Sequence, residues 1–399
     1  MPYYIGDVIK DEKMLIARTP EKFRESGVDV RTEARVEEID DKAGRVRLEG
    51  GEAIPYDTLV FGTGTRPLLP GIPGETREGV FTLKKLTDAV RIKAWIDKVS
   101  CRKAIIVGAG FIGMEVAEAF RLRGIETQIF HRSKLPVNRW DPELGAAVLE
   151  ELKRHEIEFI TGAETLAIEP GADCRLRLVT SEGGFDADLI LLGVGIRPAT
   201  ELAAGIGLPL GKSGAIQVNF SQRTPREGIY AVGDCAESFH RVTGRWVSVP
   251  LGDIANKQGR VAGVNIGGGQ AVFPGVVGAQ SFKLFDLEVA ATGIDERDAA
   301  EVGFHPVSTL IWGNALAKSM PANRKLGLNL IADRATGQLL GAQAVGEIGA
   351  VSRVNTLSAA LWAGMTLDDV AWLDLAYSPP VSSSWDVIHV AAQALKRLI

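Results

Sequence analysis

The amino-acid sequence predicts an α/β fold of two related units followed by a strand-rich α+β unit, and three observations support this prediction. A glycine-rich turn joins a buried strand to a helix within residues 103–132. A strand-and-turn pattern at Asp57 recurs at Asp188. From Pro274 onwards, short alternating strands dominate. Because strands that alternate with helices favour parallel sheets, we expect the first two units to contain such sheets.

The first observation is a buried strand that leads directly into three glycines. Residues 104–107 form an apolar run, and the glycines that follow have the spacing G-x-G-x-x-G, namely Gly108, Gly110 and Gly113. Apolar residues at helical spacing come next: Ile112, Val116, Ala119 and Phe120. In this motif the first glycine makes a tight turn, the second admits a pyrophosphate, and the third lets the helix pack on the strand. The flanked motif therefore predicts a Rossmann-like dinucleotide site, with the pyrophosphate at the helix N-terminus.

The second observation is an internal repeat. The pattern D-x-[LI]-[VL]-[FL]-G-x-G-x-R-P begins at Asp57 and again at Asp188, and the segments 28–34 and 157–163 before the two copies also agree. Two unrelated strands that end in glycine turns are the alternative, but a duplication explains more of the matched positions. The glycine turn precedes the second copy, whereas the equivalent position in the first copy falls before Met1. We therefore expect the first Rossmann-like unit to be N-terminally incomplete.

The remaining elements of the first three quarters follow from periodicity and capping residues. We expect a helix at 19–25, with Thr19 as N-cap and Pro20 at its first position, and a helix at 141–155 capped by Asp141. A helix begins near Thr87, and another covers 252–266. The expected strands are 28–30, 35–39, 45–48, 57–61, 127–130, 178–180, 188–192 and 229–232.

The third observation is the change of character after Pro274. Alternating residues predict strands at 280–285, 289–292, 308–312, 326–331 and 338–345. Helices are expected at 351–363, 366–373 and 387–398. This last part has no glycine fingerprint of its own.

Composition limits the classes of function. The chain has 399 residues, 46% of them hydrophobic and 24% charged, with a net charge of −5. This balance gives no reason to expect nucleic acid or a membrane as a partner. No apolar run reaches the length of a membrane span, and the first residues are not typical of a signal peptide. Three cysteines, Cys101, Cys174 and Cys235, have no metal-ligand spacing, so we expect a cytoplasmic protein without a metal.

Five motifs in this order resemble those of the FAD-dependent pyridine nucleotide–disulfide oxidoreductases. They are YDTLVFGTGTRP, GAGFIGMEVAE, IYAVGDCAE, PLGDIANKQGRVAGVNI and LDLAYSPPVSSSWDVIHVAAQ. Within the family the chain looks most like the branch of CoA-disulfide reductases, NADH oxidases and NADH peroxidases. The resemblance covers the whole chain and implies a homodimeric enzyme with FAD and NADP or NAD as cofactors and a small-molecule substrate. The implied domains are FAD-binding (1–100 and 201–272), NAD(P)-binding (101–200) and dimerisation (273–399).

The resemblance implies a flavin site after two of the strands. Asp234, after Gly233, is expected to hydrogen-bond the ribityl chain, with a helix cap as the alternative role. Backbone contacts to the flavin are expected from the start of the helix at 252–266, namely from Leu251, Gly252 and Ala255. Thr63 and Gly64 are expected on the flavin side of the first glycine turn.

On the nicotinamide side, the resemblance assigns Phe111 as the aromatic that gates access to the flavin and Glu115 as a carboxylate beside it. For both, ordinary helix packing is the alternative. Ile112 and Gly195 are expected among the cofactor contacts. Where NAD sites favour Asp or Glu at the end of the second strand, this chain has His131 and Arg132. These donors suit a 2′-phosphate, so we favour NADPH or no strong preference; a solvated loop is the alternative.

The chain departs from its relatives at three places. Their redox-active cysteine lies in C-x-L-P-Y-Y-I-G, and here that position falls before Met1. We therefore expect either a start codon assigned too far downstream, which we favour, or a shortened paralogue. At Tyr377, in contrast, the chain agrees with its relatives: it matches a tyrosine that reaches across to the partner's disulfide site in CoA-disulfide reductases, with packing on a proline turn as the alternative. No tyrosine stands within 317–321, and Trp385 replaces a basic residue, so CoA-disulfide is a doubtful substrate.

These observations predict a hydride transfer from NAD(P)H to flavin and on to a disulfide, polysulfide, thiol-linked or oxygen acceptor. The alternative is a non-catalytic paralogue that binds NAD(P) and dimerises without flavin. A third option is an oxidase that works without any cysteine and releases peroxide.

Overall fold

The computed structural model describes residues 1–172 and 174–399, which form two compact units. Unit 1 contains Met1–Lys10, Pro67–Gly195 and Val277–Ile399. Unit 2 contains Asp11–Arg66 and Ile196–Val276. The chain therefore crosses from one unit to the other at several points.

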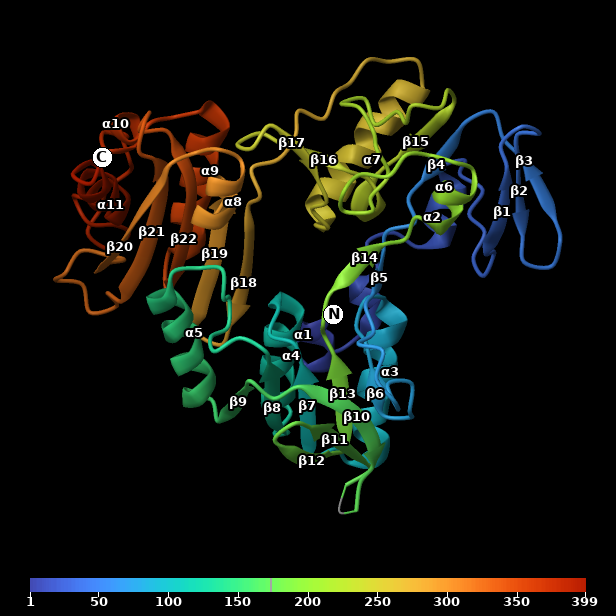
Figure 1. Cartoon of the computed structure of the whole chain (residues 1–399), viewed down its shortest axis with the longest axis horizontal. Coiled ribbons are helices and arrows are strands. Elements are labelled where there is room, and N and C mark those ends of the chain that lie inside the picture. The colour runs from blue at the N-terminus through green and yellow to red at the C-terminus, as the bar shows by residue number, and fades with distance from the viewer. Residues whose placement is uncertain (173) are drawn as a thin grey trace. The chain divides into compact units, whose positions relative to one another are not determined.

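One part of unit 1 is a five-stranded parallel sheet with the order β6-β13-β7-β8-β9 (Figure 1). Its strands are β6 (Val80–Phe81), β7 (Lys103–Val107), β8 (Glu126–His131), β9 (Ile157–Thr161) and β13 (Leu189–Leu192). The associated helices are α3 (Leu86–Val99), α4 (Phe111–Leu122) and α5 (Pro142–Arg154). All four residues of β13 are buried, which explains why its sequence is continuously apolar rather than alternating.

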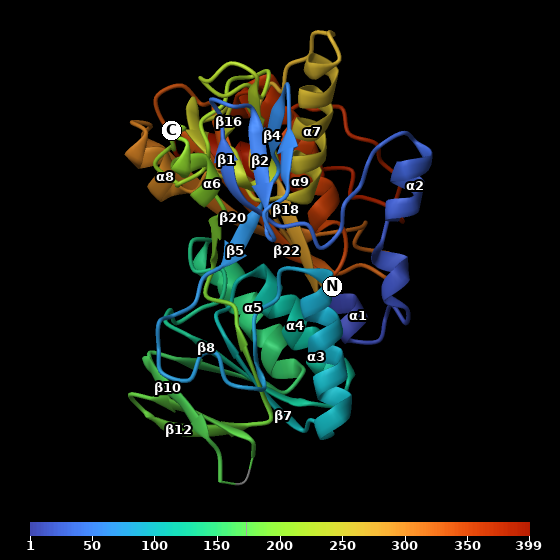
Figure 2. The same cartoon turned by 90° about the vertical axis from the view of Figure 1, so that its right-hand side faces the viewer.

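The N-terminal turn of unit 1 packs on these helices. Helix α1 (Pro2–Ile5) contacts both α3 and α4 (Figure 2). A Cβ atom on Gly6 would lie 2.9 Å from the Cα atom of Ala119, so only glycine allows this close approach. The side chains of Tyr4 and Ile5 are buried as a result.

The C-terminal part of unit 1 is an antiparallel sheet with the order β18-β19-β22-β21-β20. Its strands are β18 (Gln280–Leu284), β19 (Leu287–Gly293), β20 (Pro306–Asn314), β21 (Lys325–Asp333) and β22 (Leu339–Gly346). The helices of this part are α8 (Glu296–Glu301), α9 (Ala350–Ala363), α10 (Leu367–Val370) and α11 (Val387–Lys396). Helix α9 lies against β19 and β22, and α11 against β20 and β21, so the central strands are buried.

Unit 2 combines small sheets with one long helix. Its strands are β1 (Val36–Asp40), β2 (Arg45–Leu48), β3 (Ala53–Pro55), β4 (Leu59–Phe61), β5 (Thr65–Pro67), β14 (Ile196–Pro198), β15 (Ile229–Ala231), β16 (Ser238–His240) and β17 (Arg245–Val247). Its helices are η1 (Glu12–Leu15), α2 (Pro20–Glu25), α6 (Glu201–Gly205), η2 (Gly233–Cys235) and α7 (Gly252–Ile266). The parallel pair β15-β4 carries the core of this unit, which includes Phe61, Ile229 and Ala231.

The structure confirms most of the internal repeat. The antiparallel meander β1–β3 precedes β4 and β5, and a second meander, β10–β12, precedes β13 and β14. The second meander consists of β10 (Thr165–Pro170), β11 (Leu176–Thr180) and β12 (Gly183–Ala187). The short strands β5 and β14, one from each copy, pair with each other.

The expected strand at 28–30 is wrong, because these residues have no regular structure. Val28 is 48% exposed, whereas the matching segment of the second copy is β9, which pairs with β8. Among the described residues nothing pairs with 28–30, so its apolar alternation has no surface to cover. The expected helix at 366–373 is shorter in the structure and covers only α10.

The division into functional domains stays a prediction. β6 and α3 fall within the expected range 1–100 but belong to unit 1, together with the strands around the glycine turn. In the described part of the chain, no helix is both long and apolar enough to cross a bilayer.

Candidate cofactor-binding site

The turn between β7 and α4 has the geometry that its three glycines predict. Gly108 has φ +108°, and a Cβ atom there would lie 2.3 Å from the carbonyl oxygen of Gly193. A Cβ atom on Gly113 would lie 2.3 Å from the carbonyl oxygen of Gly108. Gly110 is the N-cap of α4, and no other atom lies within 4 Å of the position of its Cβ. Two glycines are thus required by the packing of the protein itself, and the third leaves open space at a helix N-terminus.

This open space fits a dinucleotide pyrophosphate. Helix α4 has 12 residues, and the backbone N–H groups of its first turn favour an anion. Ile112 lies in this first turn and is 41% exposed. Gly195 follows β13 at the same edge of the sheet and has φ +127°, which favours glycine.

His131 ends β8 and is coupled to the glycine turn. Its Nδ1 atom accepts a hydrogen bond of 3.4 Å from the N–H of Ala109. Burial, with a smaller effect from Arg132, lowers the pKa of His131. The imidazole is therefore neutral at pH 7 and supports the turn, whereas Arg132 beside it is exposed.

A pocket of about 270 Å³ is formed by residues of the segment that directly follows His131 and Arg132 in the sequence. It is lined by Ser133, Lys134 and Asn138 among others, and Nδ2 of Asn138 donates a hydrogen bond of 2.7 Å to Oγ of Ser133. Lys134 and Asn138 are exposed. The loop thus offers hydroxyl, amide and ammonium groups close to the end of β8.

The first turns of α4 hold the two other predicted residues of this side. The ring of Phe111 packs on the ring of Phe282 with a centroid distance of 4.8 Å and an interplanar angle of 31°. Burial raises the pKa of the Glu115 carboxyl, and neighbouring Glu118 adds to the effect. Phe111 therefore makes the packing contact that was the alternative to a gate, and Glu115 is held partly buried.

In unit 2, Gly233 and Asp234 follow β15 directly. Gly233 has φ +72°, and a Cβ atom there would lie 3.2 Å from the Cβ atom of Ala255 in α7. Oγ1 of Thr65 donates a hydrogen bond of 3.3 Å to Oδ2 of Asp234. Asp234 thus lies in η2, between the end of β15 and the start of β5, and its expected contact with a ribityl chain stays a prediction.

The predicted residues of the first glycine turn and of α7 surround this position. Oγ1 of Thr63 donates to the carbonyl oxygen of Ala199 at 2.6 Å. Gly64 has φ +67°, and no atom lies within 4 Å of the position of its Cβ. The position of a Cβ atom on Gly252 is equally free of atoms within 4 Å. Gly252 follows Leu251, the N-cap of the 15-residue helix α7. These backbone positions are open, and α7 directs a helix N-terminus to this end of unit 2.

The residues present fit the flavin end of FAD, since Asp234, the two open glycines and the N-terminus of α7 offer a hydroxyl acceptor, close backbone approach and N–H donors. The parallel sheet beside them consists, among the described residues, of β4 and β15. The nicotinamide dinucleotide fits unit 1 through the turn at Gly108–Gly113.

Gln258 is a functional neighbour that the sequence analysis missed. It is completely buried in α7, accepts a hydrogen bond of 2.7 Å from the N–H of Gly233, and donates 2.9 Å to Oγ of Ser238. It therefore fixes the Gly233–Asp234 turn against α7. A polar residue at a core-facing position, four residues after Ile254 and three before Val261, was the signal that could have identified it.

Two of the three cysteines have a raised pKa, and the third is buried in the core of unit 2. Burial raises the pKa of Cys101 to about 12, and burial also raises that of Cys174. Cys235 is fully buried, with Sγ 3.6 Å from the carbonyl oxygen of Phe61. A reactive thiol needs a lowered pKa, which Cys101 and Cys174 do not have, and Cys235 packs in the core of unit 2.

The aromatic residues near the C-terminus lie on the surface of unit 1. Tyr377 is 54% exposed and Trp385 is 51% exposed. The ring of Trp385 contacts Trp372 and His389 at centroid distances of 6.0 and 5.8 Å. Exposed aromatic rings of this kind are enriched at protein interfaces.

Glu237, three residues after Asp234, is buried without a cation. It is 5% exposed, and among the described residues no hydrogen bond or ion pair to its carboxylate is found. Burial raises its pKa.

We expect Glu237→Gln to raise the free energy of unfolding at pH 8 by about 1 kcal/mol, because the charged form is disfavoured when buried. The pKa is raised on folding, so the native state of the wild type loses stability as the pH rises through the unfolded and then the folded pKa. Urea unfolding at pH 4 and pH 8 measures this difference. An equal effect of the substitution at both pH values would contradict the assignment.

Comparisons with known proteins agree with this geometry. Residues 4–259 match the pyridine nucleotide-disulphide oxidoreductases, and residues 279–387 match the dimerisation domain of the same proteins. The chain is 37% identical to the NAD(P)H sulfur oxidoreductase (CoA-dependent) of Pyrococcus furiosus, over 99% of this chain and 89% of that protein. It is 30% identical to the coenzyme A disulfide reductase of Staphylococcus aureus, over 99% of this chain and 90% of that protein.

A solved structure gives the same result for the fold. The NAD-dependent persulfide reductase from A. fulgidus superposes with a TM-score of 0.95 and 36% identity, over 100% of this chain and 75% of that one. The resemblance that the five motifs indicated is thus confirmed. The chain belongs to the pyridine nucleotide-disulphide oxidoreductase family, enzymes whose cofactors are FAD and NAD(P)H.

Proposed function

We propose that this chain passes a hydride from NAD(P)H to FAD and on to a disulfide, polysulfide, thiol-linked or oxygen acceptor. The observation that carries the proposal is the open position at Gly110, at the N-terminus of α4. At the glycines on either side, Gly108 and Gly113, a Cβ atom would clash with the backbone. Such a turn accommodates a pyrophosphate without any movement of the protein. The similarity to a sulfur oxidoreductase and a persulfide reductase favours sulfur compounds as acceptors.

On the nicotinamide side, we assign the pyrophosphate to the turn made by Gly108, Gly110 and Gly113, with Ile112 and Gly195 beside it. Neutral His131 holds the turn through Ala109. Phe111 is assigned to the nicotinamide end, where its packing on Phe282 keeps the ring in a fixed position until the cofactor enters. Glu115 remains a candidate for proton movement, because a carboxyl with a raised pKa exchanges protons closer to neutral pH.

On the flavin side, FAD supplies the acceptor for a hydride when it is bound. We assign Asp234 to the ribityl hydroxyls, supported by the hydrogen bond from Thr65 that orients its carboxylate. Gly233, Thr63 and Gly64 line the same turn. Leu251, Gly252 and Ala255 begin α7, whose dipole favours negative charge at the adjacent ligand atoms.

We assign none of the three cysteines as the thiol that would pass electrons to a disulfide. Each is buried or has a raised pKa, whereas exchange requires a thiolate. This favours testing acceptors that react with reduced flavin directly, oxygen among them, beside the sulfur compounds. A non-catalytic, NAD(P)-binding dimer without flavin is the second candidate, and the small parallel sheet β15-β4 favours it.

The experiment is an acceptor panel on the purified full chain, with FAD added. NADPH and NADH oxidation are followed with polysulfide, CoA persulfide, CoA-disulfide and oxygen. The proposal expects a protein with a flavin spectrum and turnover with at least one acceptor. A colourless protein that still binds NADPH, and that shows no turnover, would establish the second candidate instead.

We further propose that the chain is a homodimer in which Tyr377 faces the partner. The match to the dimerisation domain and the exposed rings of Tyr377 and Trp385 support this assignment. Mass measurement by light scattering tests it, and a stable monomer would contradict it.

For the choice of nicotinamide cofactor, we expect Arg132→Ala to raise the KM for NADPH about tenfold, because a charge-assisted hydrogen bond to a 2′-phosphate contributes ~1.5 kcal/mol or more. The KM for NADH should change less than about twofold, since NADH lacks that phosphate. Steady-state kinetics with both cofactors make the comparison. Equal changes for NADPH and NADH would show that Arg132 is only a solvated loop residue.

A further inference from the structure

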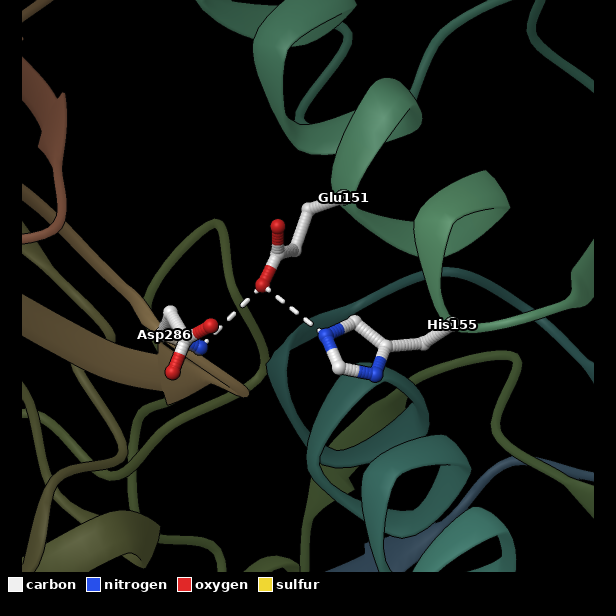
Figure 3. Close-up of side chains that lie close together, drawn as sticks. All are labelled: Glu151, His155 and Asp286. Atoms are coloured by element: carbon white, nitrogen blue, oxygen red, sulfur yellow. Dashed lines mark hydrogen bonds and ion pairs between the residues drawn. The ribbon is translucent and has the colours of Figure 1, made fainter.

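We infer that Glu151, His155 and Asp286 form a binding site for a borderline divalent cation, of which Zn²⁺ is the best example. The inference does not depend on the proposed function. Figure 3 shows Glu151 and His155 on the same side of the end of α5, with Asp286 facing them from the turn between β18 and β19. All three lie in unit 1, and one ligand atom from each lies within 4.8 Å of the others.

Two of the ligands are positioned by helix geometry. Glu151 and His155 are four residues apart, with His155 at the C-cap of α5, so both side chains project from one face. Nε2 of His155 lies 3.4 Å from Oε1 of Glu151. Tetrahedral zinc with bonds of about 2.0–2.1 Å separates its ligand atoms by roughly 3.3 Å, so this pair already has the required spacing.

The His155 side chain is 32% exposed, and its Nε2 atom faces the site, where its polar neighbour is Oε1 of Glu151. Nε2 of His155 is buried and makes no hydrogen bond within the described chain. The ring is held flat against Phe285, with a centroid distance of 3.6 Å and an interplanar angle of 7°. A buried nitrogen in a fixed ring, aimed at a carboxylate, is what a metal ligand requires before the metal arrives.

The turn that carries Asp286 is also fixed. The N–H of Phe285 donates to Oε2 of Glu118 at 2.8 Å, and the N–H of Asp286 donates to Oε1 of Glu151 at 3.1 Å. Phe285 itself has φ +49°, an uncommon backbone conformation for a bulky residue. The Asp286 side chain remains 66% exposed, so it can rotate toward the site and leaves a path for an ion from solvent.

An arginine already pairs with the two carboxylates of the cluster. The guanidinium of Arg154 contacts Oε2 of Glu151 at 2.5 Å and Oδ2 of Asp286 at 3.0 Å. Its side chain is 51% exposed, so it can move into water at small cost. A divalent ion would replace this contact, and one imidazole with two carboxylates favours zinc, cobalt or nickel over calcium and magnesium.

The sequence analysis expected no metal because the three cysteines lack metal-ligand spacing. It did not link Asp286 to Glu151 and His155, since Asp286 is distant from α5 along the chain. A bound ion would connect the end of α5 with the β18–β19 turn. It would therefore raise the melting temperature of the protein, by an amount that keeps growing with the logarithm of the ion concentration above the Kd.

The test is calorimetric titration of Zn²⁺ into the full chain after treatment with a chelator. We expect one ion per chain, an affinity about tenfold weaker or worse in His155→Ala and Asp286→Asn, and a tighter affinity in Arg154→Gln, which removes the competing cation. The control is His305→Ala, an exposed histidine outside the cluster, which should bind as the wild type does.

Two results would overturn the inference. One is an absence of binding in the wild type at millimolar Zn²⁺. The other is unchanged stoichiometry and affinity in both weakened variants, which would place the ion elsewhere. Asp286→Asn changes an exposed turn residue and keeps the test valid even when His155→Ala folds poorly; thermal melts without metal verify the fold of each variant.

Discussion

Gly110→Ala is expected to weaken NAD(P)H binding by about tenfold to a hundredfold, because a methyl group in the open turn occupies the space that the pyrophosphate needs. The protein itself should tolerate the change. Gly110 has φ −75° and ψ 175°, which alanine adopts without strain, and no atom lies within 4 Å of the new methyl group. Loss of glycine at the N-cap should cost at most about 1 kcal/mol of stability.

Fluorescence titration with NADPH and urea unfolding measure the two quantities separately. Gly205→Ala in α6 is a matched control, since its Cβ also meets no atom within 4 Å. In contrast, Gly108→Ala should destabilise the fold, because its Cβ would clash with Gly193. If Gly110→Ala binds NADPH as tightly as the wild type, the turn does not hold the pyrophosphate.

Asp386→Ala is expected to lower the free energy of unfolding by about 3–5 kcal/mol, because it leaves the Arg353 guanidinium buried without its counter-charge. Arg353 and Asp386 are 7% and 5% exposed, and Nη2 of Arg353 lies 2.7 Å from Oδ2 of Asp386. Asp386 also caps α11 by accepting from the N–H of Ile388 at 3.0 Å. The substitution thus removes an ion pair and a helix cap together.

Urea unfolding monitored by circular dichroism measures this loss. Asp368→Ala is the control, because Asp368 of α10 pairs with Lys396 of α11 at the surface, where such a pair contributes about 1 kcal/mol or less. Burial acts to raise the pKa of Asp386, but the hydrogen bonds from Arg353 and Ile388 outweigh it, and the pKa is lowered. Stability from this pair should therefore be lost as the pH falls below the ordinary range of aspartate. Equal losses in the two variants would contradict the buried role.

Local signals in the sequence predicted the strand–turn–helix segment around Gly108 well. The β7 strand, the glycine turn and α4 depend on contacts within about thirty residues, so apolar spacing and glycine positions specify them. The sequence also predicted helix starts correctly. Asp141, for example, caps its helix as expected, because its Oδ1 atom accepts a hydrogen bond of 2.9 Å from the N–H of Glu143. The failure at 28–30 has the opposite cause, because a strand also needs a neighbour and the segment has none among the described residues.

Long-range contacts could not be predicted from the sequence. Thr65 and Asp234 are 169 residues apart, and Glu151 and Asp286 are 135 apart, so no local pattern links them. The electrostatic state of His131 also escaped prediction. A cationic donor was expected there, but burial lowers the pKa of the imidazole, and its Nδ1 atom accepts a hydrogen bond from the N–H of Ala109. The predicted preference for a 2′-phosphate therefore depends on the exposed cations Arg132 and Lys134 and stays a prediction.

The most direct measurement is the anaerobic addition of NADPH, and separately of NADH, to the full chain loaded with FAD. A hydride passed to the bound flavin removes its visible absorbance band, and Gly110→Ala should need a higher NADPH concentration for the same change. Bleaching with either cofactor is the result we expect. A flavin-loaded protein whose band persists with both cofactors would contradict the assignment of the two sites to one hydride-transfer reaction.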